Sequence, residues 1–205
     1  MRPKPKPRLL NTSRITVAAF ALLNEQGLHA FSLRTLASRL DVHVSALYRH
    51  FENKDALLLH LTRTMLDDQP LAMPKNEKAT WQEWLLASAH SLRNALLTYR
   101  DGPQLCVAYH QQIDSAHSRA LFHALHVQGF THRDASYCVS TLTNFIIGFT
   151  LEEEYERSHL NDERPEIANR PLSVNVSAPA RTADIEFAYS LELFINGIDA
   201  TVKRM

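Results

Sequence analysis

Apolar residues recur every three or four positions along most of the chain, a spacing typical of amphipathic α-helices rather than strands. The first such segment covers residues 11–26 and stops before Gly27, a residue type that often follows the last turn of a helix. Its apolar stripe consists of Ile15, Ala18, Ala19, Leu22 and Leu23. Asn11, Thr12 or Ser13 is available as the N-cap.

Three further helices are predicted before the first break in the pattern. They are expected over residues 32–40, 44–50 and 53–66. Ser32 and Asn53 stand where an N-cap is needed, and residues 41–43 form a turn between the first two of these helices. Pro70 and Pro74 then interrupt the pattern. We therefore expect an N-terminal domain of residues 1–69 and a C-terminal domain of residues 70–205.

The C-terminal domain is again helical in every segment with a clear period. Thr80 and Glu83 have the spacing of a capping box at the start of a helix that runs to about Leu96, before Asp101-Gly102-Pro103 interrupts it. Further helices are expected over about 104–109, 114–128, 132–157 and 182–203, with a loop over 158–180. Apolar residues cover more than half the circumference of the last helix. This breadth predicts either a second contact, such as a subunit interface, or a fully buried central helix.

Composition fits a globular protein that folds without covalent staples. The chain has 205 residues, 22 basic and 22 acidic side chains, 5 glycines and 2 cysteines. Two distant cysteines make no disulfide framework, so a reducing compartment is expected. Residues 1–7 lack the apolar region of a secretory signal, and the most apolar stretch, 138–151, is too short to span a bilayer. We therefore expect a soluble, cytoplasmic protein.

The zero net charge conceals an asymmetry between the two ends of the chain. Residues 1–54 hold nine basic and three acidic side chains, a net charge of +6, and the remainder carries −6. A basic end on an acidic body is typical of a nucleic-acid reader joined to a scaffold that itself repels phosphate. A basic segment that is merely solvated explains the same numbers.

The strongest motif is the segment FSLRTLASRLDVHVSALYRHFENK, residues 31–54. Two short helices joined by a tight turn form a helix-turn-helix, whose second helix can enter the major groove of DNA. The residues that this helix and its flanks can present to DNA are His43, Val44, Ser45, Ala46, Tyr48 and Arg49. Tyr48 can equally pack its ring inward. Lys54, at the start of the next helix, can clamp a phosphate.

The same residues resemble the DNA-binding domain of the tetracycline-repressor (TetR) family. The resemblance runs from Arg14 to Leu59 and includes Gly27, the Leu47-Tyr48 pair and the His50-Phe51 pair. It continues into the ligand-binding domain of the tetracycline-responsive members through Trp81, Arg100-Asp101-Gly102, Gln128-Gly129-Phe130, Gly148, Leu151-Glu152 and Leu191-Glu192-Leu193. The match thus covers nearly the whole chain.

The resemblance implies a homodimer that binds a palindromic double-stranded DNA operator and is released by a small-molecule effector. The DNA contacts that carry over are Arg34, Ser45, Ala46, Tyr48, His50 and Lys54. Val44 stands where the tetracycline-responsive members have a base-reading glutamine, so a different operator sequence is expected.

The implied drug site carries over poorly. Where those members have a histidine, an asparagine, a phenylalanine, a magnesium-ligating histidine and a Thr-Arg pair, this chain has Pro70, Ser88, Leu92, Cys106 and Tyr109-His110. Glu152 matches a carboxylate that orients magnesium-bound water, and we expect it alone in the run of glutamates 152–156 to face inward. Trp84, Asn144 and Phe145 complete the expected site. A thiol is a poor ligand for Mg²⁺, so we expect a mainly apolar or aromatic effector with neither metal nor cofactor.

Two other function classes remain possible on the residues alone. Cys106 with His110, or His123 with His126, has the spacing of two metal ligands on one helical face, although solvated histidines and a small buried cysteine explain both pairs. The rival to a regulator is a metal-dependent helical enzyme that uses Cys106, His110 and Glu152. A DNA-binding scaffold without a ligand is the third alternative.

Overall fold

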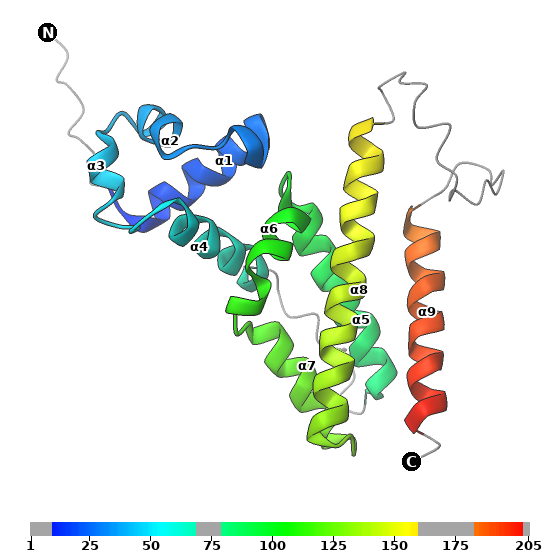
Figure 1. Ribbon diagram of the computed structural model, residues 1–205. Helices are drawn as coiled ribbons and strands as arrows, with labels where there is room; N and C mark the ends of the chain where they lie inside the picture. The colour runs from blue at the N-terminus through cyan, green and yellow to red at the C-terminus, as the bar shows by residue number, and fades with distance from the viewer. Residues whose placement is uncertain (1–9, 69–78, 160–182, 203–205) are drawn as a thin grey trace, which may run out of the picture. The chain divides into compact units, whose positions relative to one another are not determined.

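The computed structural model describes residues 10–68, 79–159 and 183–202, and every regular element in these ranges is a helix (Figure 1). The predicted all-α fold is therefore confirmed. The predicted loop over residues 158–180 lies outside the described residues, apart from 158 and 159, which end a helix.

The described chain forms two compact units that interleave along the sequence. The first combines the residues up to Asp68 with Ala95–Ser115, and the second combines Gln69–Asn94 with the residues from Ala116 onward. Residues 95–115 thus pack with the N-terminal helices, although residues 69–94 of the second unit separate them in the sequence. The predicted domain division at residues 69 and 70 stays a prediction.

The first unit begins with four helices whose starts are fixed by local side-chain caps. These are α1 (Thr12–Ala30), α2 (Leu33–Leu40), α3 (Val44–Leu47) and α4 (Lys54–Asp67). Asn11 Oδ1 accepts a hydrogen bond from the backbone N–H of residue 14 (2.9 Å), Ser32 Oγ from that of residue 35 (3.1 Å) and Asn53 Oδ1 from that of residue 56 (2.8 Å). Each cap satisfies an N–H group that the helix itself leaves unpaired.

Helix α3 is shorter than the sequence predicts. It ends at Leu47, whereas the pattern predicted a helix to His50. The carbonyl oxygen of Leu47 accepts hydrogen bonds from the backbone N–H groups of both His50 and Phe51, which closes the chain into a turn. The buried Phe51 ring follows this turn, so tertiary packing ends the helix early.

The first unit is completed by α6 (Gly102–Tyr109) and the 3₁₀ turn η1 (His110–Gln112). Helix α6 starts about two residues earlier than predicted, because Pro103 stands in its first turn, where the missing N–H is not needed. The core of this unit is mainly apolar, and the hydroxyl of the fully buried Thr62 donates to the carbonyl oxygen of Leu58. The most deeply buried apolar side chains include Ile15, Leu23, Leu36, Leu47, Leu57, Leu61, Met65, Leu96 and Leu105.

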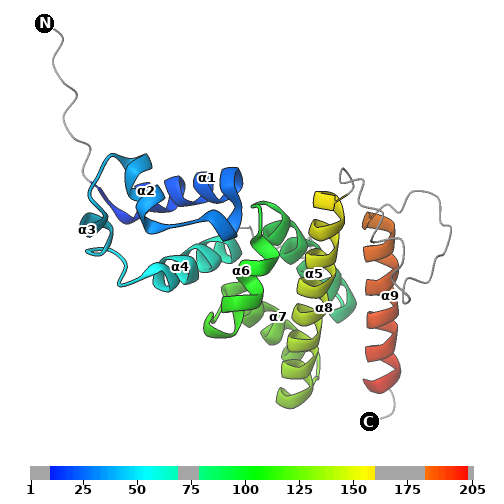
Figure 2. The ribbon, with the colours of Figure 1, turned by 45° about the horizontal axis from the view of Figure 1, so that its top comes forward.

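The second unit contains most of α5 (Trp81–Leu97), together with α7 (Ala116–Val127), α8 (His132–His159) and α9 (Ala183–Val202). The predicted capping box at the start of α5 is present, because Thr80 N donates to Glu83 Oε2 (2.7 Å) and Glu83 N donates to Thr80 Oγ1 (3.3 Å). Figures 1 and 2 show α8 and α9 running side by side. Phe187, Leu191 and Ile195 form the buried stripe of α9.

Candidate functional site

The helix-turn-helix presents a short helix whose outer face is open to solvent. The turn is closed by Asp41, which adopts the left-handed conformation (φ 53°), and by a hydrogen bond from Val42 N to the carbonyl of Ala37 (3.1 Å). Leu47, 1% exposed, fastens α3 to the core. The side chains that α3 and its flanks leave exposed are His43, Ser45, Tyr48, Arg49 and His50, while Val44 and Ala46 are half-buried.

Tyr48 faces solvent rather than the core. Its side chain is 53% exposed, so the alternative in which its ring packs inward is wrong. A tyrosine on an exposed turn offers both an apolar ring and a hydroxyl to a partner. Tyr48 therefore belongs to the same open surface as Arg49 and His50.

Lys54 is held in place at the start of α4. Its ammonium donates to the carbonyl oxygen of Phe31 (2.7 Å) and lies 5.7 Å from the centroid of the Phe31 ring. An ammonium has three N–H donors, so this bond leaves two for a phosphate. Arg34, in the first turn of α2, is exposed.

Arg39 on α2 has a close acidic partner on α1. Arg39 donates two hydrogen bonds to Glu25, at 2.5 and 2.7 Å, and these bonds lower the pKa of the Glu25 carboxyl group. The pair ties α2 to α1 and offsets the charge of Arg39. The open cationic groups near α3 are therefore Arg34, Arg49 and the ammonium of Lys54.

The segment between α5 and α6 packs against the end of α1, a contact that the sequence pattern does not predict. Asp101 Oδ2 accepts a hydrogen bond from Leu28 N (2.5 Å), next to Gly27 with its positive φ of 76°. Arg100 N donates to Asn24 Oδ1 (2.9 Å). Asp101 and Leu28 are 73 positions apart, so no local pattern reveals the contact.

Three residues assigned to the ligand site lie on α6 and η1, inside the first unit. Tyr109 donates its hydroxyl hydrogen to Asp55 Oδ1 on α4 (2.8 Å), and burial together with this bond raises the pKa of Tyr109 to about 12. His110 Nδ1 lies 2.7 Å from the carbonyl oxygen of Cys106. Both side chains thus hold hydrogen bonds to their own unit.

Cys106 does not fit a magnesium site. Its side chain is 1% exposed, and burial raises the pKa of the thiol to about 12, so the thiol stays protonated near neutral pH. Mg²⁺ takes oxygen ligands, and a neutral buried thiol offers none. The described geometry therefore agrees with the chemical argument from the sequence.

Helix α5 carries three of the expected ligand residues on one face. Trp84, Ser88 and Leu92 are four residues apart, with Trp84 half-buried, Ser88 4% exposed and Leu92 9% exposed. His117 at the start of α7 hydrogen-bonds to the backbone of Ser88, and burial lowers the pKa of its imidazole in spite of that bond. His117 was not among the residues expected from the sequence, because a single histidine early in a helix gives no signal.

Helix α8 carries the other expected ligand residues, and one of them is placed differently from the prediction. Asn144 is exposed, and Phe145 is half-buried and stacks with the rings of Phe187 and Phe194 on α9. Glu152 is exposed, so the expectation that it alone turns inward is wrong. Glu153, 4% exposed, is the inward carboxylate. Pro70 lies outside the described residues.

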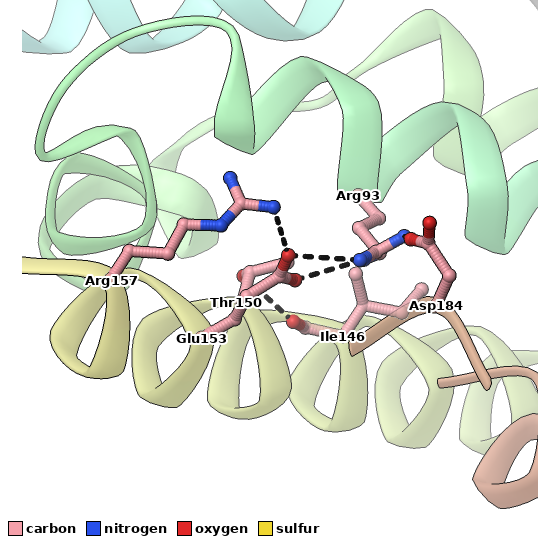
Figure 3. A network of polar contacts seen from close by, with 6 residues as sticks. All are labelled: Arg93, Ile146, Thr150, Glu153, Arg157 and Asp184. Carbon is pink, nitrogen blue, oxygen red and sulfur yellow. Dashed lines mark hydrogen bonds and ion pairs between the residues drawn. The ribbon is translucent and has the colours of Figure 1, made fainter. Parts of the chain in front are cut away.

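The reason for the inward position of Glu153 is a buried arginine on α5. Arg93, 6% exposed, donates to both carboxylate oxygens of Glu153 (3.0 and 2.9 Å) and to Oδ1 of Asp184 on α9 (2.7 Å), as Figure 3 shows. Arg157 also bonds to Glu153. Burial opposes the charge of Arg93, but its hydrogen bonds to the two carboxylates outweigh that effect and raise its pKa. The guanidinium also lies 4.9 Å from the centroid of the Phe187 ring.

Helix α9 has a second apolar stripe that the described chain leaves open. Ile185, Tyr189 and Leu193, spaced four residues apart, are 70%, 63% and 56% exposed. Tyr137 and Tyr155 on α8 are also exposed. The fully buried alternative for the last helix is therefore wrong for this chain alone. Ile195, 7% exposed, belongs to the buried stripe of the same helix.

Neither a membrane span nor a metal cluster is found within the described ranges. No helix there is long and apolar enough to cross a bilayer. In the same residues, no three His, Cys, Asp or Glu side chains gather to hold a metal ion.

Two family models match the chain, one for each region of the fold. Residues 15–61 match the model "Bacterial regulatory proteins, tetR family", and residues 73–202 match "Tetracyclin repressor-like, C-terminal domain". The class A tetracycline repressor from transposon 1721 of Escherichia coli is 32% identical over 197 residues, which cover 92% of this chain and 90% of the repressor.

Solved structures give the same result for the fold. A class A TetR with 5a,6-anhydrotetracycline and magnesium has a TM-score of 0.71 and 30% identity, covering 93% of this chain and 99% of the other. BioQ with its natural double-stranded DNA operator has a TM-score of 0.69 and 25% identity, covering 93% and 98%.

Proposed function

Because the chain belongs to the tetracycline-repressor (TetR) family of DNA-binding transcriptional regulators, we propose that it is a repressor whose operator binding responds to a small molecule. It binds a palindromic operator as a homodimer and leaves the DNA when the effector binds. The observation that carries the proposal is the exposed surface of α3 and of the turn that follows it, with Tyr48, Arg49 and His50, within the basic segment of residues 1–54. We expect it to act in the cytoplasm, where its DNA is.

The DNA contacts divide into those that position the protein and those that read bases. Lys54 and Arg34 contact phosphates from the first turns of α4 and α2, the two helices that flank α3 in the sequence. Ser45 and Arg49 reach base edges, and Val44 and Ala46 offer apolar contact to thymine methyl groups. Tyr48, His43 and His50 complete the interface.

Two variants test this division on one operator duplex. Lys54→Ala should weaken binding to all sequences and lower the salt slope by about one unit, as loss of one phosphate contact does. Arg49→Ala should change the preference among half-site variants. Isotherms that match the wild type for both variants at several salt concentrations would refute the assignment.

The homodimer is supported by the open apolar stripe of α9. The stripe exposes the apolar surface of Ile185, Tyr189 and Leu193 to water, which is energetically unfavourable. A second copy of the stripe covers this surface in a symmetric contact. Leu193→Glu should therefore prevent association, because it places a charge in that contact. Sedimentation of the wild type as a monomer at micromolar concentration would end the dimer hypothesis.

The effector is proposed to be mainly apolar or aromatic with few polar groups. Trp84, Leu92 and the half-buried Phe145 supply apolar surface, and Ser88 supplies one hydroxyl. Asn144 and Glu152, both exposed on α8, are the further polar candidates in the second unit. Helix α5 carries Ser88 and Leu92 and continues into residues 95–97 of the first unit. It therefore connects the proposed effector residues, through one continuous helix, with the unit that contains the helix-turn-helix.

We expect that magnesium-chelated tetracycline is not the effector of this protein. Calorimetry with tetracycline, with and without Mg²⁺, should give weak binding that magnesium does not change. Submicromolar affinity for tetracycline that disappears when Mg²⁺ is chelated would show that Cys106 does not exclude a magnesium-dependent ligand.

A further inference from the structure

The polar network of Figure 3 joins three helices, and two of its members, Arg157 and Asp184, lie on the surface. Arg93 of α5 and Glu153 of α8 are buried, whereas the side chain of Asp184 in the first turn of α9 is 84% exposed. Asp184 nevertheless holds the shortest bond that Arg93 makes, 2.7 Å, and this bond keeps the pKa of its carboxyl group low. An ion pair with an exposed carboxylate adds little to the free energy of unfolding. The contact therefore matters for where it holds α9 rather than for stability.

The apolar contacts of α9 are less directional than its polar contacts. Phe187, Leu191 and Ile195 form a regular stripe with one buried residue per turn. Apolar burial is non-directional, so a slip of α9 by one turn would keep apolar residues against α8, although it would break the ring contacts of Phe145 with Phe187 and Phe194. A guanidinium has its donors in a fixed plane, and its bonds to carboxylates are directional.

Glu153 on α8 holds the guanidinium of Arg93 independently of α9. Its Nε and one terminal nitrogen form a fork with Glu153, and the other terminal nitrogen points to Asp184. Phe187, one turn further along α9, packs under the same guanidinium. The network therefore contacts α9 at two places that a slipped helix could not satisfy together.

We propose that Arg93 and Asp184 are positioning residues that set the register of α9 and thereby align Ile185, Tyr189 and Leu193 for association with a second copy. Asp184 directly precedes Ile185, so its bond fixes the stripe at its first residue. This inference rests on the proposed homodimer. It adds that neither Arg93 nor Asp184 has to touch the partner to control dimer strength.

The test measures the dimer dissociation constant of the full chain by fluorescence-detected sedimentation at low and high salt. Asp184→Asn should raise that constant about fivefold at low salt, and less as salt screens the exposed partner. Asp184→Glu, which keeps the charge, is the matched control and should stay within about twofold of the wild type. Operator affinity per dimer should not change in either variant.

A double-mutant cycle separates positioning from the general effect of an acid in the first turn of a helix. In the Arg93→Lys background, Asp184→Asn should have a clearly smaller effect, because an ammonium lacks the planar fork that bonds Glu153 and Asp184 at once. An Asp184→Asn effect that is equal in both backgrounds, or absent in the wild type, would overturn the inference. A monomeric wild type would instead refute the proposed dimer, so the two failures are distinguishable.

Discussion

Gly102 has a packing role that one added methyl group tests. It is buried at the start of α6, and its φ is not in the left-handed region, so space alone decides what alanine does there. A Cβ at this position would lie 2.2 Å from the carbonyl oxygen of Leu96 and 3.2 Å from Met65 Sδ. The oxygen belongs to the backbone, so a rotamer change of Leu96 cannot move it away.

The magnitude follows from the depth of this overlap. Overpacking a well-filled core costs about 1–3 kcal/mol. A contact more than 1 Å inside ordinary van der Waals distance with backbone lies at the upper end, about 3 kcal/mol. For a chain of this size we expect the melting temperature to fall by about 6–12 °C in Gly102→Ala.

The assay is thermal and urea unfolding of the full chain at one fixed protein concentration, because dimerisation couples stability to concentration. Ala108→Gly, at an exposed site of the same helix, is the control and should cost only the intrinsic difference of about 0.5–1 kcal/mol. A Gly102→Ala protein that melts at or above the wild-type temperature would refute the packing argument.

Three further predictions concern single contacts. Asn53→Ala removes the bond to Ala56 N and should cost about 1 kcal/mol in chemical unfolding. Glu153→Gln should destabilise by about 3 kcal/mol or more, because it breaks the buried pair with Arg93, whereas the exposed Glu152→Gln should stay within about 0.5 kcal/mol; equal effects would contradict the assignment of the inward carboxylate. Burial raises the pKa of Cys106 from its ordinary value of 9.0 to about 12, so the protonated thiol favours the folded state. Its contribution to the free energy of unfolding is complete below about pH 9 and is lost as the pH rises towards 12. At pH 8 iodoacetamide should modify Cys106 only after urea unfolds the chain, and rapid modification of the folded protein would be inconsistent with its burial.

The sequence was sufficient where structure depends on neighbouring residues. The caps at Asn11, Ser32 and Asn53 and the capping box at Thr80 are local hydrogen bonds, so the residue types and their spacing predict them. The helix-turn-helix follows for the same reason. The exposure of Tyr48 does not follow from the sequence, because a tyrosine at that position can equally pack its ring inward.

The sequence was insufficient where a distant residue decides. Consecutive glutamates point about 100° apart around a helix, and only the position of Arg93, 60 residues earlier, selects Glu153 over Glu152. The bond between Tyr109 and Asp55 likewise joins residues 54 positions apart. Helix α3 ends early because Phe51 is drawn into the core, which the period of its apolar residues does not encode.

Selection of binding sites from a pool of random-sequence duplexes tests the central claim most directly, because the pool contains every candidate half-site. The purified full chain should enrich an inverted repeat whose half-sites are read by α3, with binding that weakens steeply as salt rises. Arg49→Ala should enrich a different half-site. Enrichment of no sequence, or of a single half-site without symmetry, would contradict an operator-binding homodimer.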